Sequence, residues 1–159
     1  MERYSLWHES SLAGEVQAAL PFGETVTLAA SAARTSNNTG TVASGLDAHH
    51  RYVVLCSITA SATDAGDTLD VYVDVSLDNA TWLNAIHFTQ QAGNGAAKKM
   101  FAVLDPSNPG TSTIDVTSDA ASGAVRPALF GPYMRARWAI ADSGDANSSH
   151  TFSVIAWAQ

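Results

Sequence analysis

A nine-residue stretch near the middle of the chain alternates apolar and polar side chains without a break. It runs from Leu69 to Leu77 and reads Leu-Asp-Val-Tyr-Val-Asp-Val-Ser-Leu. Successive side chains of a β-strand point to opposite faces, so this period of two predicts one apolar and one polar face. A helix would scatter the same apolar positions around its circumference. We therefore predict a strand whose apolar face meets a core and whose polar face meets water.

Other segments carry weaker forms of the same signal, and Gly, Asn, Asp and Pro cluster between them. These residues favour turns because they adopt a positive φ or fix φ and end pairing. The apolar run at 51–62 is compatible with a strand buried on both faces. Many strands separated by turns, without helical stretches between them, predict an all-β fold. About eight or nine strands suit an antiparallel β-sandwich of the jelly-roll type. The further predicted strands are 24–30, 51–62, 82–90, 98–105, 111–117, 133–140 and 151–157, with a weak one at 41–44.

A length of 159 residues fits one domain, which we place at residues 24–159. Residues 1–23 differ, because their apolar side chains follow neither period. This part is predicted to be an N-terminal arm or a short helix at residues 10–19, and Pro21 and Gly23 separate it from the first strand. Two alternatives stay open: it packs on its own domain, or it docks on a neighbour.

The charge balance excludes several classes of partner. Eight Lys and Arg residues stand against fifteen Asp and Glu, which gives a net charge of −7. Such a chain lacks the basic surface that neutralises phosphates, so we expect no nucleic-acid ligand. No run approaches the roughly 18 apolar residues of a membrane span, and the start lacks the pattern of a signal peptide. We therefore expect neither a membrane partner nor export.

Catalytic or metal-binding constellations are not evident in the sequence. His49 and His50 are adjacent, so a strand would point them to opposite faces. Cys56 stands among apolar neighbours, where a thiol behaves as a small hydrophobic side chain. Asp70 and Asp74 share a strand face about 13–14 Å apart, which is too far for an acid/base pair. We expect no enzyme activity, no metal and no cofactor.

Two acidic turns are the weaker candidates for a metal. Asp64 and Asp67 flank one turn, and Asp142 and Asp145 flank another. Oxygen-rich loops can bind Ca²⁺, but neither turn has the alternating ligands and distal Glu of an EF-hand. Carboxylates solvated in turns are the favoured interpretation.

Three of the eight basic residues lie close together near the C-terminal part of the chain: Arg126, Arg135 and Arg137. One interpretation pairs the arginines across strands with carboxylates such as Asp70 or Asp74. The other makes them contacts between subunits, because Arg is enriched at interfaces.

Three segments together resemble a known class of proteins: 70–82 (Asp-Val-Tyr-Val-Asp-Val-Ser-Leu-Asp-Asn-Ala-Thr-Trp), 131–138 (Gly-Pro-Tyr-Met-Arg-Ala-Arg-Trp) and 152–154 (Phe-Ser-Val). They are similar to the strand and hairpin motifs of small β-rich head decoration, or cement, proteins of tailed bacteriophages. The resemblance covers roughly residues 50–158. It implies a jelly-roll or tulip-like domain on the outer surface of the virion capsid. It also implies a homotrimer that binds the major capsid protein and catalyses no reaction.

This resemblance leads to a hypothesis of a virion structural protein that stabilises a phage head through contacts with its own copies and with the capsid. Tyr4, Leu6 and Trp7 are then the expected contacts of the arm with a neighbouring subunit or the capsid. The alternative is a carbohydrate- or receptor-binding sandwich of a phage tail or fibre. Such modules present aromatic platforms; Trp138 is expected in the core, whereas Trp157 lies on the opposite face of its strand from Phe152.

Overall fold

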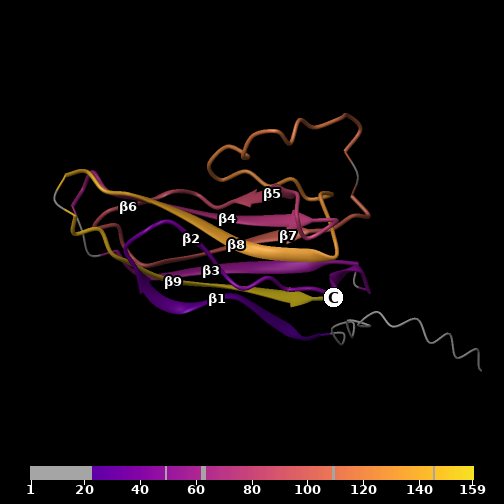
Figure 1. The fold of residues 1–159 in the computed structure, drawn as a ribbon, viewed down its shortest axis with the longest axis horizontal. Helices are drawn as coiled ribbons and strands as arrows, with labels where there is room; N and C mark the ends of the chain where they lie inside the picture. Colours follow the sequence, from indigo (N-terminus) through magenta and orange to yellow (C-terminus); the bar gives the residue numbers. More distant parts are fainter. Residues whose placement is uncertain (1–22, 49, 62–63, 109, 145) are drawn as a thin grey trace, which may run out of the picture.

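The computed structural model describes residues 23–48, 50–61, 64–108, 110–144 and 146–159, and these form a two-layered β-sandwich (Figure 1). Within these residues one 3-10 turn and no α-helix occurs, and no helix is long and apolar enough to cross a bilayer. The elements are β1 (Thr25–Arg34), β2 (Asn38–Thr39), η1 (Leu46–Ala48), β3 (Tyr52–Ser61), β4 (Thr68–Ser76), β5 (Trp82–His87), β6 (Gln91–Ala92), β7 (Lys98–Leu104), β8 (Tyr133–Ala141) and β9 (His150–Ala158).

The strands are ordered as in a jelly roll. One sheet has the order β1-β9-β3-β7, and the other has the order β2-β8-β4-β5 with β6 added beside β4. All seven strand pairings among the described residues are antiparallel, and four of them join β1 with β9, β2 with β8, β3 with β7, and β4 with β5. The chain therefore behaves as one long hairpin, with the β4–β5 turn at its tip, wound into two layers. This confirms the predicted all-β antiparallel sandwich.

The core lies between the two sheets and is filled by alternate residues of each long strand. Trp138 of β8 meets Phe152 of β9 edge to face, with ring centroids 5.5 Å apart, and both are buried. Such aromatic pairs add to the free energy gained by burying their area. Trp157 points to the other side of β9 and is exposed. The structure therefore confirms that Trp138 lies in the core and that Trp157 lies on the opposite face of its strand from Phe152.

The structure corrects the prediction of a strand at residues 111–117. These residues belong to a long segment, 105–132, that connects β7 to β8 and contains no named strand. In Figure 1 this segment rises above β5 and β4 at the top of the molecule. Residues 111–117 do alternate between apolar and polar side chains, but no neighbouring strand pairs with them. The weak strand at 41–44 is likewise reduced to a single bridge between Ala43 and Met134.

The prediction that the polar face of β4 meets water is wrong. Tyr72, Asp74 and Ser76 are all buried, because parts of segment 105–132 cover this side of the sheet. At Gly131 the segment also approaches the end of β4 so closely that an added Cβ would lie 2.5 Å from the carbonyl oxygen of Ser76. Leu77 was expected on the apolar face, yet it is 71% exposed because β4 ends at Ser76.

Burial of β3 on both faces is also not what the structure shows. Tyr52, Val54 and Cys56 are fully buried, whereas Leu55 between them is 38% exposed. The strand therefore has one face in the core and one face on the outside of the four-stranded sheet.

Candidate binding surface

The outer face of the four-stranded sheet carries two adjacent rows of apolar side chains. In one row Leu55 of β3 lies between Phe101 of β7 and Ile155 of β9. Side chains directly opposite in antiparallel strands have Cβ atoms about 4.5–5.5 Å apart, so neighbours in a row touch. The second row has the same strand order, one residue pair further along. Together the rows form what we call the apolar patch: Val53, Leu55, Phe101, Val103, Ile155 and Trp157.

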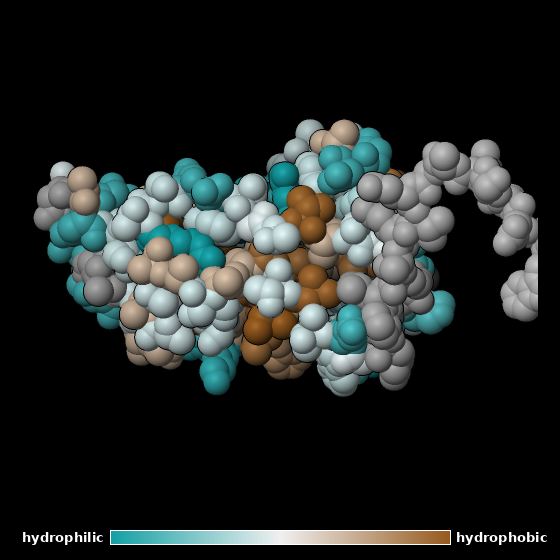
Figure 2. Space-filling model, turned by 60° about the horizontal axis from the view of Figure 1, so that its bottom comes forward, coloured by the Kyte–Doolittle hydropathy of each residue, from teal (hydrophilic) through white to brown (hydrophobic). Residues whose placement is uncertain are grey.

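The apolar patch is open to solvent where its largest side chains stand. Phe101 is 72% exposed and Trp157 is 42% exposed. Figure 2 brings this layer forward and shows hydrophobic residues gathered near the middle of the face. Trp157 is held in place by its indole Nε1, which donates to the carbonyl oxygen of Gly23 at 3.0 Å. A contiguous exposed apolar area of this kind is typical of an interaction site rather than of ordinary surface.

Opposite charges stand at the two ends of the patch along β7. Every second residue of β7 points to the outer side of the sheet, and Asp105, directly after the strand, continues the series. These residues are Lys99, Phe101, Val103 and Asp105. Lys99 is exposed and forms no ion pair within the described residues. The hydroxyl and backbone N–H of Ser107 donate to Asp105 and hold the pKa of its carboxyl below the usual range. The patch thus runs from a lysine to an ionised aspartate.

The predicted cross-strand pairing of arginines is present at Asp74, on the opposite sheet. Arg137 Nε donates to Asp74 Oδ2 at 3.0 Å, and Arg135 Nε lies 3.5 Å from the same oxygen. Asn84 Nδ2 adds a third contact, to Oδ1 at 3.2 Å. Asp70 does not take part. This cluster is part of the internal structure, and contact of either arginine with another copy stays a prediction.

Aromatic rings complete the surroundings of both arginines. The guanidinium carbon of Arg135 lies 4.1 Å from the ring centroid of Trp82, and that of Arg137 lies 4.0 Å from Tyr72. Burial lowers the pKa of Arg137, but hydrogen bonds and charges from Asp74 and Asp119 outweigh this effect and raise it. Both side chains are therefore held in place within one subunit.

Arg126 fastens segment 105–132 onto β5. Its Nη1 donates to the carbonyl oxygen of Asn84 at 2.8 Å, and its Nη2 donates to those of Asp115 and Ser118, each at 3.0 Å. A guanidinium suits this task because it presents several donors in a fixed plane. The structure therefore gives Arg126 an internal role; a role at a subunit interface stays a prediction.

His87 also links β5 to segment 105–132, and this role was not predicted from the sequence. Its Nδ1 donates to the carbonyl oxygen of Ala120 at 2.8 Å, and its Nε2 lies 2.8 Å from Asp70 Oδ1. Gln90 Nε2 donates to the other oxygen of this carboxylate, also at 2.8 Å. No sequence signal identifies the arrangement, because Ala120 offers only a backbone carbonyl from a distant segment.

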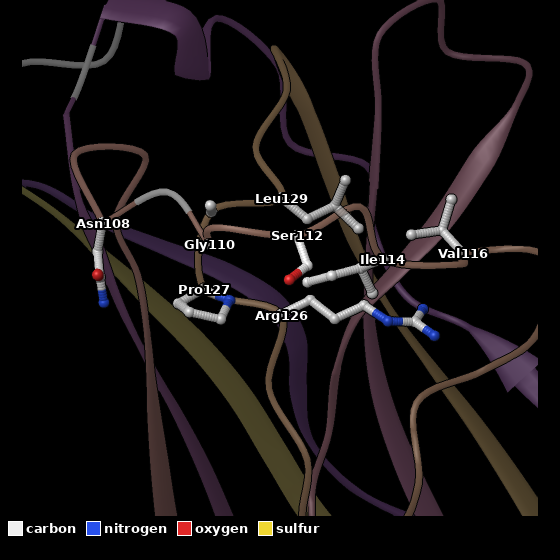
Figure 3. Close-up of a pocket in the computed structure, with 9 residues that line it drawn as sticks. Asn108, Gly110, Ser112, Ile114, Val116, Arg126, Pro127 and Leu129 are labelled. Carbon is white, nitrogen blue, oxygen red and sulfur yellow. The ribbon is translucent and has the colours of Figure 1, made fainter.

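A hollow of about 360 Å³ lies within segment 105–132, between residues 108–116 and 126–129. Every second residue from Asn108 to Val116 lines the hollow, as the alternation in the sequence suggests. Figure 3 shows Ile114 beside the aliphatic stem of Arg126, whose guanidinium is already engaged with backbone carbonyls. The lining holds no other ionisable side chain, so the hollow offers apolar contact and no acid/base pair.

The carboxylates of the two acidic turns accept hydrogen bonds, Asp67 from the neighbouring acidic turn and Asp142 within its own turn. Asp67 is fully buried, and its Oδ1 accepts from the backbone N–H and the hydroxyl of Ser143. Asp142 accepts from three backbone N–H groups, those of Gly144, Ala146 and Ser148. Asp145 lies outside the described residues. Among those described, no group of three or more His, Cys, Asp or Glu side chains is arranged to hold a metal ion.

Tyr4, Leu6, Trp7 and the possible helix at residues 10–19 also lie outside the described residues. Their predicted contacts therefore stay predictions. The surface that the structure does show, the apolar patch, was not singled out from the sequence. Alternation within 51–62 and 98–105 was the available signal, but it becomes a patch only when the strand order is known.

Comparisons of this chain with protein-family models, with curated proteins and with solved structures find no significant match.

Proposed function

We propose that this chain is a non-enzymatic structural protein of a virion, which decorates and stabilises the outer surface of a tailed-phage capsid. It acts as a homo-oligomer, most simply a trimer, bound to the major capsid protein. The observation that carries the proposal is the apolar patch. A sheet face on which Phe101 is 72% exposed provides an apolar surface whose burial by another molecule is favourable.

The jelly roll supports the proposal at the level of fold. This architecture recurs in viral capsid and lectin domains, where the sandwich is a rigid carrier for surface contacts. Fold alone does not imply function, so the argument rests on the site together with the resemblance of residues 70–82 and 131–138 to phage decoration proteins.

Rigidity is a second supporting feature. Arg126 and His87 tie segment 105–132 to β5, and the Asp74 cluster joins β4 to β8. A protein that cements a shell gains from such ties, because an ordered surface loses little conformational entropy on binding. Several copies in one oligomer then multiply a modest contact into strong retention.

The test is binding to capsids. Expanded heads assembled from the same genome without this chain are mixed with the purified protein and sedimented. We expect saturable co-sedimentation at a fixed number of copies per major capsid protein, and heads that resist heating better once decorated. Absence of binding to such heads would remove the assignment.

A carbohydrate- or receptor-binding module of a phage tail or fibre is the second candidate. The observation that favours it is the pair of exposed aromatic side chains, Phe101 and Trp157, on one sheet face. Aromatic faces of this kind can stack on sugar rings. A glycan array separates the two functions: reproducible binding that is lost in Trp157→Ala, together with no binding to heads, would favour the module.

A further inference from the structure

We infer that the partner of the apolar patch is a second copy of this chain, with Lys99 of one copy placed against Asp105 of the other. The inference rests on the proposed function, which requires self-association but does not say where it occurs. It commits the patch to contacts between copies and leaves the capsid contact to another surface.

The shape of the face fits a second sheet. Sheets pack face to face about 10 Å apart when both present regular rows of side chains. The rows Phe101–Leu55–Ile155 and Val103–Val53–Trp157 supply such a surface, and a second copy brings the same one. Four strands spaced about 4.8 Å apart and seven to ten residues long cover roughly 500 Å². With the loops at its ends, the face approaches the ~800 Å² that each partner buries in an ordinary stable interface.

Charge also favours a copy of the same chain. A protein of net charge −7 repels itself over most of its surface, whereas the two rows of the patch contain no ionisable side chain. Lys99 at one end of the patch faces outward without an ion pair among the described residues, and Asp105 at the other end is ionised, with Arg51 near enough for its charge to help lower the pKa of that carboxyl. An antiparallel arrangement about a two-fold axis brings the lysine of each copy to the aspartate of the other.

Such a contact has two-fold symmetry. The same face meets from both copies, so the interface is isologous and closes as a dimer, whereas a ring of three copies needs two different surfaces. An antiparallel alignment places Phe101 of each copy inside the contact and brings the Lys99 and Asp105 ends together twice. The patch therefore accounts for self-association in pairs, and the trimer of the proposed function requires a further surface.

The first test substitutes Phe101→Ser in the full-length chain and measures mass by size-exclusion chromatography with light scattering over a dilution series. Leu77→Ser is the matched control, because Leu77 is 71% exposed but follows β4 and lies outside the patch. Phe101 contributes little to the core, so both variants should fold and show the circular dichroism of the wild type. We expect self-association weakened roughly 30-fold or more in Phe101→Ser, as for a central interface residue, and unchanged in Leu77→Ser. A wild-type chain that is monomeric at all concentrations, or an oligomer whose mass Phe101→Ser leaves unchanged, would overturn the inference.

The second test reverses the two charges. Lys99→Glu should weaken association at low ionic strength, and the double variant Lys99→Glu/Asp105→Lys should restore it, because the pair is rebuilt in the opposite sense. Since Asp105 also accepts hydrogen bonds from Ser107 and lies within the influence of the charge of Arg51, the double variant is first compared with the wild type in thermal unfolding. Equal association in the Lys99→Glu chain and the wild type contradicts the assigned orientation.

Head binding separates the failure of this inference from the failure of the proposed function. If Phe101→Ser keeps the oligomeric state of the wild type but no longer binds undecorated heads, the capsid covers the patch; the inference falls and the proposed function stands. If the wild type oligomerises through the patch but never binds heads, the inference stands and the proposed function falls.

Discussion

The carboxylate of Asp74 on β4 accepts a hydrogen bond from Arg137 on β8, with 3.0 Å between the arginine Nε and the aspartate Oδ2, although Arg137 lies diagonally across from it, two residues beyond its register partner Arg135. The carboxylate is only 4% exposed, whereas the guanidinium side chain keeps 27% of its surface in contact with water. Arg135 and Asn84 reach the same carboxylate. A single buried negative charge therefore organises two cations on the covered face of the five-stranded sheet.

Asp74→Asn should destabilise the fold substantially. The variant keeps the side-chain volume but leaves two guanidiniums beside a neutral amide. Breaking a buried ion pair costs about 3–5 kcal/mol, and because both arginines can partly rehydrate we expect about 2–3 kcal/mol in urea unfolding. Asp119→Asn is the control, since Asp119 is 46% exposed and its bond to Arg137 should be worth less than about 1 kcal/mol. Equal losses in the two variants would mean that Asp74 does not organise the cluster.

Gly40 should not tolerate a side chain. It follows β2, where its N–H donates to the carbonyl of Ala136 at 2.9 Å, and an added Cβ would overlap the carbonyl oxygen of Leu28. Because backbone has to move to relieve this overlap, we expect Gly40→Ala to cost about 2 kcal/mol or more.

Gly144→Ala is the matched control for Gly40→Ala. No atom lies within 4 Å of a Cβ added there, and its φ is not in the left-handed region. The exchange should be neutral or stabilise by up to about 1 kcal/mol through the unfolded state. The comparison is made by thermal unfolding of the two variants beside the wild type. Equal melting temperatures for Gly40→Ala and Gly144→Ala would contradict the close approach of Gly40 to the backbone of Leu28.

The strands of this fold were largely predictable because each strand carries its own alternation. Residues 69–77 predict β4 to within one residue at each end, and the pairing of Asp74 with arginines follows from which side chains share a face. The burial of Tyr72 and Ser76 was not predictable. It depends on segment 105–132, whose sequence resembles a strand and turns but not a cover for another sheet.

The apolar patch was unpredictable for a related reason. Leu55 and Phe101 are 46 positions apart, and only the pairing of β3 with β7 places them side by side. Each residue alone is consistent with a strand buried on both faces. Whether such a position lies in the core or on the surface depends on what packs over the sheet, and the local sequence does not indicate this.

Cys56 should be unreactive in the native protein. It is the single cysteine of the chain, its side chain is fully buried, and burial raises the pKa of its thiol to about 12. Since the thiolate is the reactive form, a thiol with its pKa raised in this way stays protonated at pH 8 and reacts slowly. We expect no reaction with a disulfide reagent such as Ellman's reagent under native conditions, and one equivalent of colour in concentrated urea. Rapid native labelling would show that the sandwich opens around β3.

His150 should make stability depend on pH between about 7 and 5. The side chain is fully buried, with Nδ1 3.1 Å from Ser61 Oγ and Nε2 3.4 Å from Ser148 Oγ. Burial lowers its pKa, and the charge of Asp67 offsets this only in part. The unfolded chain therefore takes up a proton near pH 6.5 that the native chain refuses. Because the unfolded state then binds more protons, stability falls as the pH drops through this range, by at most ~1.4 kcal/mol per pH unit.

The measurement for His150 is the free energy of urea unfolding at several pH values for the wild type and for His150→Gln. A glutamine keeps hydrogen-bonding groups near Ser61 and Ser148 but cannot titrate. The variant should lose part of the slope between pH 7 and 5, whatever its stability at pH 7. His50→Gln serves as the control because His50 is exposed, and it should retain the wild-type slope. The aspartates whose pKa is lowered by turn hydrogen bonds, such as Asp105 and Asp115, lose their stabilising effect only at still lower pH and do not disturb the comparison. If the free energy of unfolding changes with pH equally in His150→Gln and the wild type, the buried imidazole of His150 is not the group whose lowered pKa causes the pH dependence.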